Sequence, residues 1–107
     1  MNPSVLTVDQ LHERLQRENP PVVLDVREAD ELAIARLDGA LHVPLSEFDS
    51  LVRTLDRHAE YVVMCHHGIR SAHAAAMMIE RGFTRVANLH GGIDAWASEV
   101  DPSTPRY

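Results

Sequence analysis

The chain has 107 residues, of which 45% are hydrophobic and 24% charged, and its formal net charge is -6 at pH 7. This length suits one compact domain with a single core, and the composition excludes a disordered or fibrous chain. The acidic balance argues against nucleic acid or anionic membranes as the main partner, because both bind to basic surfaces.

Short apolar segments alternate with segments of helical periodicity along the chain. The predicted strands are residues 5–6, 22–24, 41–43, 61–64 and 86–89. Helices are predicted after Thr7, over 28–35, from Ser46 onward and over 71–81. Strands that alternate with helices are typical of a parallel sheet, so the predicted fold class is α/β, with helices on both faces of the sheet.

The helix boundaries rest on local signals. Thr7 and Gln10 have the spacing of a capping box at a helix start, and Gly82 suits the left-handed position that ends a helix. The helix after Ser46 carries an apolar stripe that we assign to the core: Phe48, Leu51, Val52 and Leu55.

These elements place a domain over residues 1–99 and a tail over 100–107, where prolines interrupt any periodicity. The tail is predicted to be ordered at least in part, and it either lies over the functional site or extends into solvent. Apolar runs are far shorter than the ~20 residues of a membrane span. Because the first residues also lack a basic region followed by a hydrophobic segment, a cytoplasmic location is expected.

The only cysteine, Cys65, stands between the predicted strand 61–64 and the predicted helix 71–81. It cannot form an intramolecular disulfide. In a parallel α/β sheet, ligands bind beyond the carboxyl ends of the strands, and N–H groups at a helix start stabilise anions, including a thiolate. Arg70 adds positive charge, and Gly68 permits a left-handed turn or the close approach of a ligand. The loop is therefore predicted to hold a reactive thiolate beside an anionic substrate.

These residues alone leave other interpretations open. Cys65 could be a small core residue and Arg70 a surface charge, and His66 and His67 could be solvated loop residues. A metal site built from the cysteine, one of these histidines and His90 is less favoured, because adjacent residues at a strand end usually point in different directions. No metal and no cofactor are therefore predicted.

Three short motifs stand in order along the chain: Asp25-Val26-Arg27-Glu28, Cys65-His66-His67-Gly68-Ile69-Arg70-Ser71 and Gly91-Gly92-Ile93-Asp94-Ala95-Trp96. In that order they resemble the Asp-x-Arg-Glu segment, the Cys-x-x-Gly-x-Arg-Ser loop and the Gly-Gly-x-x-x-Trp segment of the rhodanese (thiosulfate sulfurtransferase) family. The resemblance extends over nearly the whole chain. One departure is the segment 35–40, where the family often has Gly-His-Ile-x-Gly-Ala and this chain keeps only Gly39-Ala40.

The resemblance implies a rhodanese-like fold, with a five-stranded parallel sheet in which the second and fourth strands are neighbours. Asp25 and Arg27 would then lie beside Cys65, and we expect them to support the cysteine loop through hydrogen bonds. The loop residues expected to bind the substrate are His66, His67, Gly68, Ile69, Arg70 and Ser71.

The resemblance also implies a reaction. Cys65 would take a sulfane sulfur from thiosulfate or from a persulfide, hold it as a cysteine persulfide and pass it to a thiol, to cyanide or to a protein acceptor. The chain would then be a thiosulfate sulfurtransferase with ping-pong kinetics.

Two other functions stay open at this point. One is a non-catalytic binding module, or a sulfur carrier dedicated to protein partners. The other is a cysteine phosphatase or an arsenate reductase, which is less favoured because such loops have five residues between the cysteine and the arginine, and this one has four.

Overall fold

The fold is a five-stranded parallel sheet, as predicted. The computed structural model describes residues 2–107, so Met1 of the predicted domain 1–99 lies outside the described residues. The strands are β1 (Ser4–Leu6), β2 (Val22–Asp25), β3 (Leu41–His42), β4 (Glu60–Met64) and β5 (Arg85–Leu89). They are arranged in the order β1-β5-β4-β2-β3, and every neighbouring pair is parallel.

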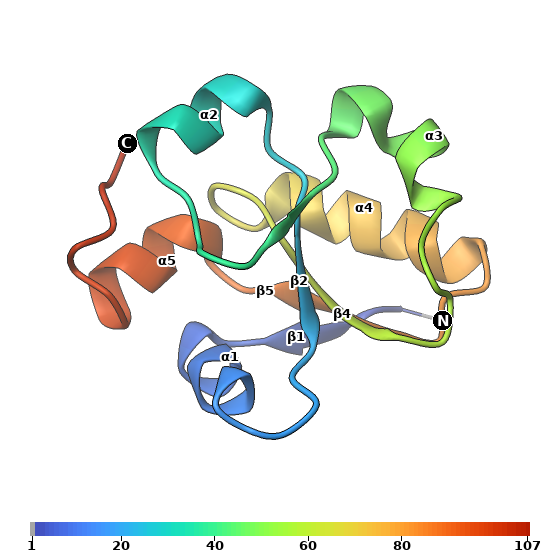
Figure 1. The fold of residues 1–107 in the computed structure, drawn as a ribbon, viewed down its shortest axis with the longest axis horizontal. Coiled ribbons are helices and arrows are strands. Elements are labelled where there is room, and N and C mark those ends of the chain that lie inside the picture. The colour runs from blue at the N-terminus through green and yellow to red at the C-terminus, as the bar shows by residue number, and fades with distance from the viewer. Residues whose placement is uncertain (1) are drawn as a thin grey trace.

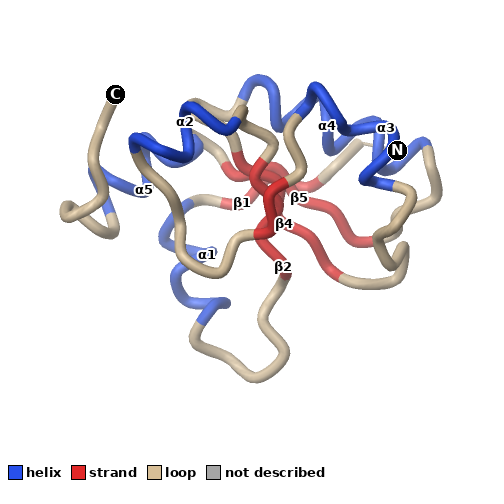
Figure 2. The backbone as a smooth tube through the Cα atoms, turned by 45° about the horizontal axis from the view of Figure 1, so that its top comes forward, coloured by secondary structure: helices blue, strands red, loops and turns tan. Residues whose placement is uncertain are grey.

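Helices cover both faces of the sheet (Figures 1 and 2). They are α1 (Val8–Leu15), α2 (Ala29–Ile34), the 3-10 turn η1 (Leu45–Glu47), α3 (Phe48–Val52), α4 (Ile69–Glu80) and α5 (Gly92–Glu99). One hydrophobic core packs α3 and α4 against the sheet, and a second core packs α1 and α5 against the other face. No helix within residues 2–107 has both the length and the apolar character required to cross a membrane.

Strand β4 contributes to both cores, because successive side chains of a strand point to opposite faces. Tyr61 and Val63 enter the core under α4, whereas Val62 and Met64 enter the core under α1 and α5. The residue after the strand, Cys65, continues this alternation and belongs to the α4 side.

Most helix boundaries agree with the sequence analysis. The capping box of Thr7 and Gln10 is present, with both of its hydrogen bonds. Gly82 adopts the left-handed conformation, and Phe83 folds back into the core after it. The apolar stripe that follows the turn η1 packs into the core under α4, as predicted.

Helix α4 begins two residues earlier than predicted. Gly68, in the left-handed conformation, caps the helix, so Ile69 and Arg70 belong to its first turn rather than to the loop. The prediction failed because no side-chain capping residue marks this start: the cap is a backbone conformation that glycine permits. The consequence is a cysteine loop of only a few residues between β4 and α4.

The carboxyl ends of β2, β4 and β5 meet at one edge of the sheet. Asp25 pairs with Met64 across β2 and β4, and the Val26 N–H continues this pairing by donating to the Met64 carbonyl at 3.0 Å. Cys65 therefore lies at the central carboxyl edge, where ligand sites of open parallel sheets form.

The first turn of α5 docks directly onto the cysteine loop. The Ile93 N–H donates to the Cys65 carbonyl at 2.9 Å, and the Asp94 N–H donates to the His66 carbonyl at 3.1 Å. This approach requires glycine at position 92, because a Cβ there would lie 2.5 Å from the His66 carbonyl oxygen and closer still to that of Cys65. The φ angle of Gly92 is also positive, at 58°.

A Gly92→Ala substitution should therefore destabilise the fold by about 3 kcal/mol or more, because the new methyl group meets backbone atoms that cannot move aside. Gly39→Ala is the matched control: Gly39 has a φ of 82°, but its Cβ position is open. That substitution should cost about 1 kcal/mol, the strain of the left-handed backbone alone. Urea denaturation of the wild type and the two variants measures the free energy of unfolding. Equal losses of stability in both variants would contradict the docking of α5 onto the cysteine loop.

Candidate active site

The sulfur of Cys65 is surrounded by donors from the start of α4. The Gly68 N–H lies 3.1 Å from Sγ, and the Ser71 hydroxyl lies 3.3 Å from it. Cys65 and Ser71 are both buried, with 1% and 0% of their surface exposed. The cysteine therefore occupies a small enclosed cup whose polar groups are hydrogen-bond donors.

These donors change the acidity of the thiol. Burial of the thiol acts to raise the pKa of Cys65, because low dielectric disfavours the charged form. Hydrogen bonds from the Ser71 hydroxyl and from the backbone N–H groups of Ser71, Gly68 and His67 act in the opposite direction and outweigh burial. The net pKa of Cys65 is lowered from its ordinary value, so the cup favours the thiolate.

Asn88 of β5 holds the Ser71 hydroxyl from the other side. Its Oδ1 accepts a hydrogen bond from Ser71 Oγ at 2.5 Å, and its Nδ2 donates to the Gly68 carbonyl at 3.0 Å. The single hydroxyl proton of Ser71 thus has two acceptors, Asn88 Oδ1 and the sulfur. A negative charge on the sulfur makes the hydrogen bond from Ser71 to the sulfur stronger.

Arg70 pairs with a carboxylate that the sequence analysis did not single out. Its guanidinium makes a two-pronged contact with Glu31 of α2, with N–O distances of 2.7 and 2.8 Å. This pairing lowers the pKa of Glu31 to about 2. Arg70 was expected to add positive charge to the loop, and in the structure this charge is paired with Glu31. Backbone N–H groups and a hydroxyl remain as the donors that face the sulfur.

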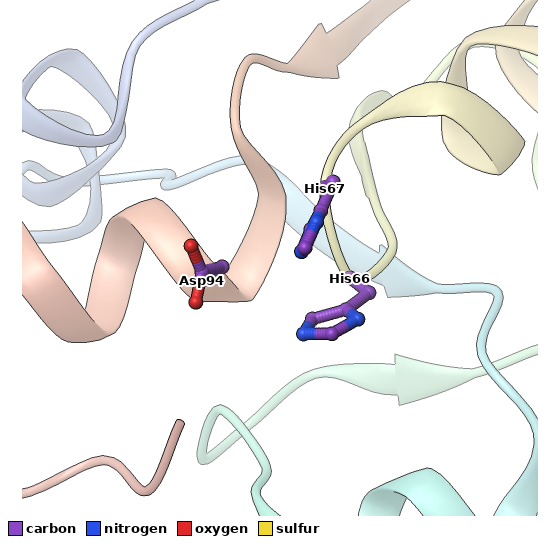
Figure 3. Close-up of side chains that lie close together, drawn as sticks. All are labelled: His66, His67 and Asp94. Carbon is purple, nitrogen blue, oxygen red and sulfur yellow. The ribbon is translucent and has the colours of Figure 1, made fainter. Parts of the chain in front are cut away.

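His66 and His67 lie on the same side of the loop, close to Asp94 of α5 (Figure 3). The ring centroids of the two histidines are 3.9 Å apart, and one ligand atom from each of the three residues lies within 4.8 Å of the others. The rings of the adjacent residues His66 and His67 thus face the same side of the loop, and the ring of His66 also stacks on that of Tyr107. Both oxygens of Asp94 accept hydrogen bonds from Arg106, which lowers the pKa of Asp94 and places a guanidinium beside that carboxylate.

Asp25 and Arg27 form a buried ion pair at the end of β2. The two side chains approach to 2.7 Å and are almost fully buried. Arg27 also donates to the carbonyls of Glu31 and Ala35, and to the hydroxyl of Tyr107. The two side chains are turned away from solvent and, within residues 2–107, their hydrogen bonds go to each other, to the α2 region and to Tyr107. They were expected to support the cysteine loop through hydrogen bonds. The observed contacts reach the loop through Glu31 and Arg70.

Two further residues of the predicted site, Ile69 and His66, differ in how far they are exposed. Ile69 projects outward from the first turn of α4 and is 73% exposed. His66 is partly buried, and its Nε2 atom has no hydrogen-bond partner within the described chain. His90, considered as a metal ligand at the sequence level, is exposed and lies outside the cluster of His66, His67 and Asp94.

Three contributors to the site were not identified from the sequence: Glu31, Asn88 and Tyr107. Asn88 had a usable signal, because it is a polar residue inside an otherwise apolar strand. Glu31 and Tyr107 had none, because their contacts join residues 39 and 80 positions apart in the chain.

Comparison with known proteins agrees with this geometry. The model of the Rhodanese-like domain family matches residues 7–99. Proteins named thiosulfate sulfurtransferase GlpE are 34% identical over 90 residues in Pseudomonas fluorescens and 35% identical over 91 residues in Pseudomonas aeruginosa, covering 84% and 85% of this chain and 83% of each relative.

A crystal structure of a rhodanese-related protein from Thermoplasma volcanium superposes with a TM-score of 0.82 at 31% identity, covering 91% of this chain and 93% of that one. The family match spans the strands β2 to β5, the cysteine loop and the first turn of α5 together. The chain therefore belongs to the rhodanese-like domain family.

Proposed function

We propose that this protein is a sulfurtransferase that carries a sulfane sulfur on Cys65. The observation that carries the proposal is the convergence of backbone N–H groups and the Ser71 hydroxyl on the cysteine sulfur. Such a cup stabilises a thiolate before reaction, and it can stabilise the terminal sulfur of a persulfide afterwards, as an oxyanion hole stabilises oxygen.

The reaction has two half-reactions. In the first, the Cys65 thiolate attacks the outer sulfur of thiosulfate; a new S–S bond forms, the old one breaks, and sulfite leaves with the bonding electron pair. In the second, a nucleophile such as cyanide or a thiolate attacks the outer sulfur of the persulfide. The S–S bond to Cys65 breaks, and the thiolate is regenerated for another cycle.

The donor is proposed to be a small sulfur anion, with thiosulfate as the first to test. Relatives named thiosulfate sulfurtransferase support this choice. The sulfonate oxygens of thiosulfate would compete with Glu31 for the guanidinium of Arg70, in the first turn of α4. A persulfide donor and a protein acceptor use the same chemistry at Cys65. We place the reaction in the cytoplasm, where low-molecular-weight thiols are available as acceptors.

The geometry gives less support to phosphoryl transfer. A phosphatase needs cationic and N–H donors around three phosphoryl oxygens, whereas the donors of this enclosed cup converge on one sulfur atom. A short loop around one buried sulfur fits a single transferred sulfur atom better.

Intact mass spectrometry tests the central step. Incubation of the reduced protein with thiosulfate, followed by removal of the reagent, should add the mass of one sulfur atom to the chain. Cyanide or a thiol should remove that mass, because the persulfide sulfur is transferable. The Cys65→Ser variant should show no addition.

Two results would separate the alternatives. Persulfide formation without turnover on cyanide or small thiols would favour a carrier dedicated to protein partners. No adduct with thiosulfate or with a low-molecular-weight persulfide would contradict the proposal, and phosphatase and arsenate reductase assays would follow.

The Ser71→Ala variant tests whether the Ser71 hydroxyl stabilises the Cys65 thiolate. Removing a donor to the charged sulfur should raise the pKa of Cys65, so the alkylation rate should rise to its plateau at a higher pH than in the wild type. The value of kcat/KM with thiosulfate at neutral pH should fall roughly tenfold, the effect of one hydrogen bond to a charged group.

Ser98→Ala serves as the control, because Ser98 is exposed on α5 and its hydroxyl donates only to its own helix. Its alkylation profile and kinetics should match the wild type. A Ser71→Ala profile that coincides with the wild type would show that the hydroxyl does not stabilise the thiolate.

A further inference from the structure

Segment 101–107 turns back from the end of α5 toward the cysteine loop. The Asp101 N–H donates to the Trp96 carbonyl at 2.9 Å, Asp101 in turn accepts from Ser103, and Thr104 is buried. Figure 1 shows the chain leaving the end of α5 and ending beside α2. The segment therefore has a defined path across this edge of the molecule.

Arg106 anchors the segment to the site. Its guanidinium makes two parallel hydrogen bonds to Asp94, with N–O distances of 3.0 and 3.1 Å. Asp94 is the residue whose N–H holds the His66 carbonyl. A two-pronged contact of this kind fixes direction as well as distance, so the anchor sets where the next side chain lies.

That next side chain, Tyr107, contacts both the cysteine loop and its supporting residues. Its ring stacks on the His66 ring, with centroids 3.8 Å apart and planes inclined by 3°. Its hydroxyl accepts from Arg27 at 2.8 Å and donates to Glu31 at 3.0 Å. Tyr107 thus bridges the residue after Cys65 and the counter-ion of Arg70.

We propose that Tyr107 is a specificity-determining residue of the site, forming an outer wall that restricts the size of the molecules that reach the Cys65 sulfur. Cys65 is 1% exposed, so any partner must enter between the elements around the loop, and Tyr107 spans His66 and Glu31 there. Small acceptors such as cyanide pass this wall readily, whereas bulky thiols must first displace the ring. This inference rests on the proposed function for its substrates, but the access argument stands on the geometry.

Alkylation tests access without any assumption about activity, because Cys65 is the only cysteine in the chain. The measured quantity is the ratio of the rate constants for a bulky reagent, fluorescein maleimide, and a small one, iodoacetamide. Both reagents react with the same thiolate, so the ratio cancels changes in the pKa of Cys65. Tyr107→Ala should raise this ratio several-fold over the wild type.

Two further variants separate the effect of the Tyr107 ring from the effects of its hydroxyl and of the Arg106 contact. Tyr107→Phe keeps the stacking on His66 and loses the hydroxyl, so its ratio should stay near the wild-type value. Arg106→Gln loosens the anchor and should give an intermediate ratio. Val5→Ala, an exposed position on the distant edge strand β1, controls for general effects. An unchanged ratio in Tyr107→Ala, with the variant folded by circular dichroism, would overturn the proposal.

Sulfur transfer provides the second readout. Starting from the persulfide, Tyr107→Ala should raise kcat/KM for glutathione relative to cyanide, mainly through a lower KM for the larger acceptor. A changed alkylation ratio in a protein that forms no persulfide would support the wall and contradict the proposed function. Persulfide transfer with an unchanged alkylation ratio and an unchanged acceptor preference would support the proposed function and contradict the wall.

Discussion

The site depends on the contact between the cysteine loop and the first turn of α5. Two backbone N–H groups of α5 donate hydrogen bonds to the carbonyls of Cys65 and His66. These bonds fix the direction in which the loop's peptide groups point. With these carbonyls engaged outside the cup, the N–H groups of the following residues are left to face the sulfur. The glycine at position 92 makes the contact possible. A residue far from the cysteine in sequence thus determines the electrostatics around its sulfur.

The positive potential around the Cys65 sulfur does not come from the charged side chains near it in sequence. The cysteine loop and the first turn of α4 contain an arginine and two histidines, yet the arginine is paired with Glu31 and the histidines lie beside Asp94. The thiolate is stabilised by aligned N–H groups and one hydroxyl, which act at short range in a buried place. Such donors favour an anion without placing a full charge against it, and they require little rearrangement when the sulfur is extended to a persulfide.

Sequence reasoning located the parallel sheet, the helices on its two faces and the position of Cys65 at a strand end, because these follow from periodicity and local signals. The start of α4 was misplaced because a left-handed glycine, not a capping side chain, begins that helix. The pairing of Arg70 with Glu31 and the stacking of Tyr107 on His66 could not be predicted, because each joins segments that lie far apart in the chain. Asn88 was the exception: its polarity inside an apolar strand was visible, but its partner was not.

The buried pair of Asp25 and Arg27 explains how these distant segments are held together. Burying two charges is costly unless each is fully hydrogen-bonded, and removing one partner would leave the other uncompensated. Arg27 meets that requirement by bonding to Asp25, to two carbonyls around α2 and to Tyr107. The same hydrogen bonds that compensate its burial hold the helix that carries Glu31 and the ring that stacks on His66. A charge placed in the interior at the end of β2 therefore organises the outer side of the site, where the partner of Arg70 and the proposed wall both depend on it.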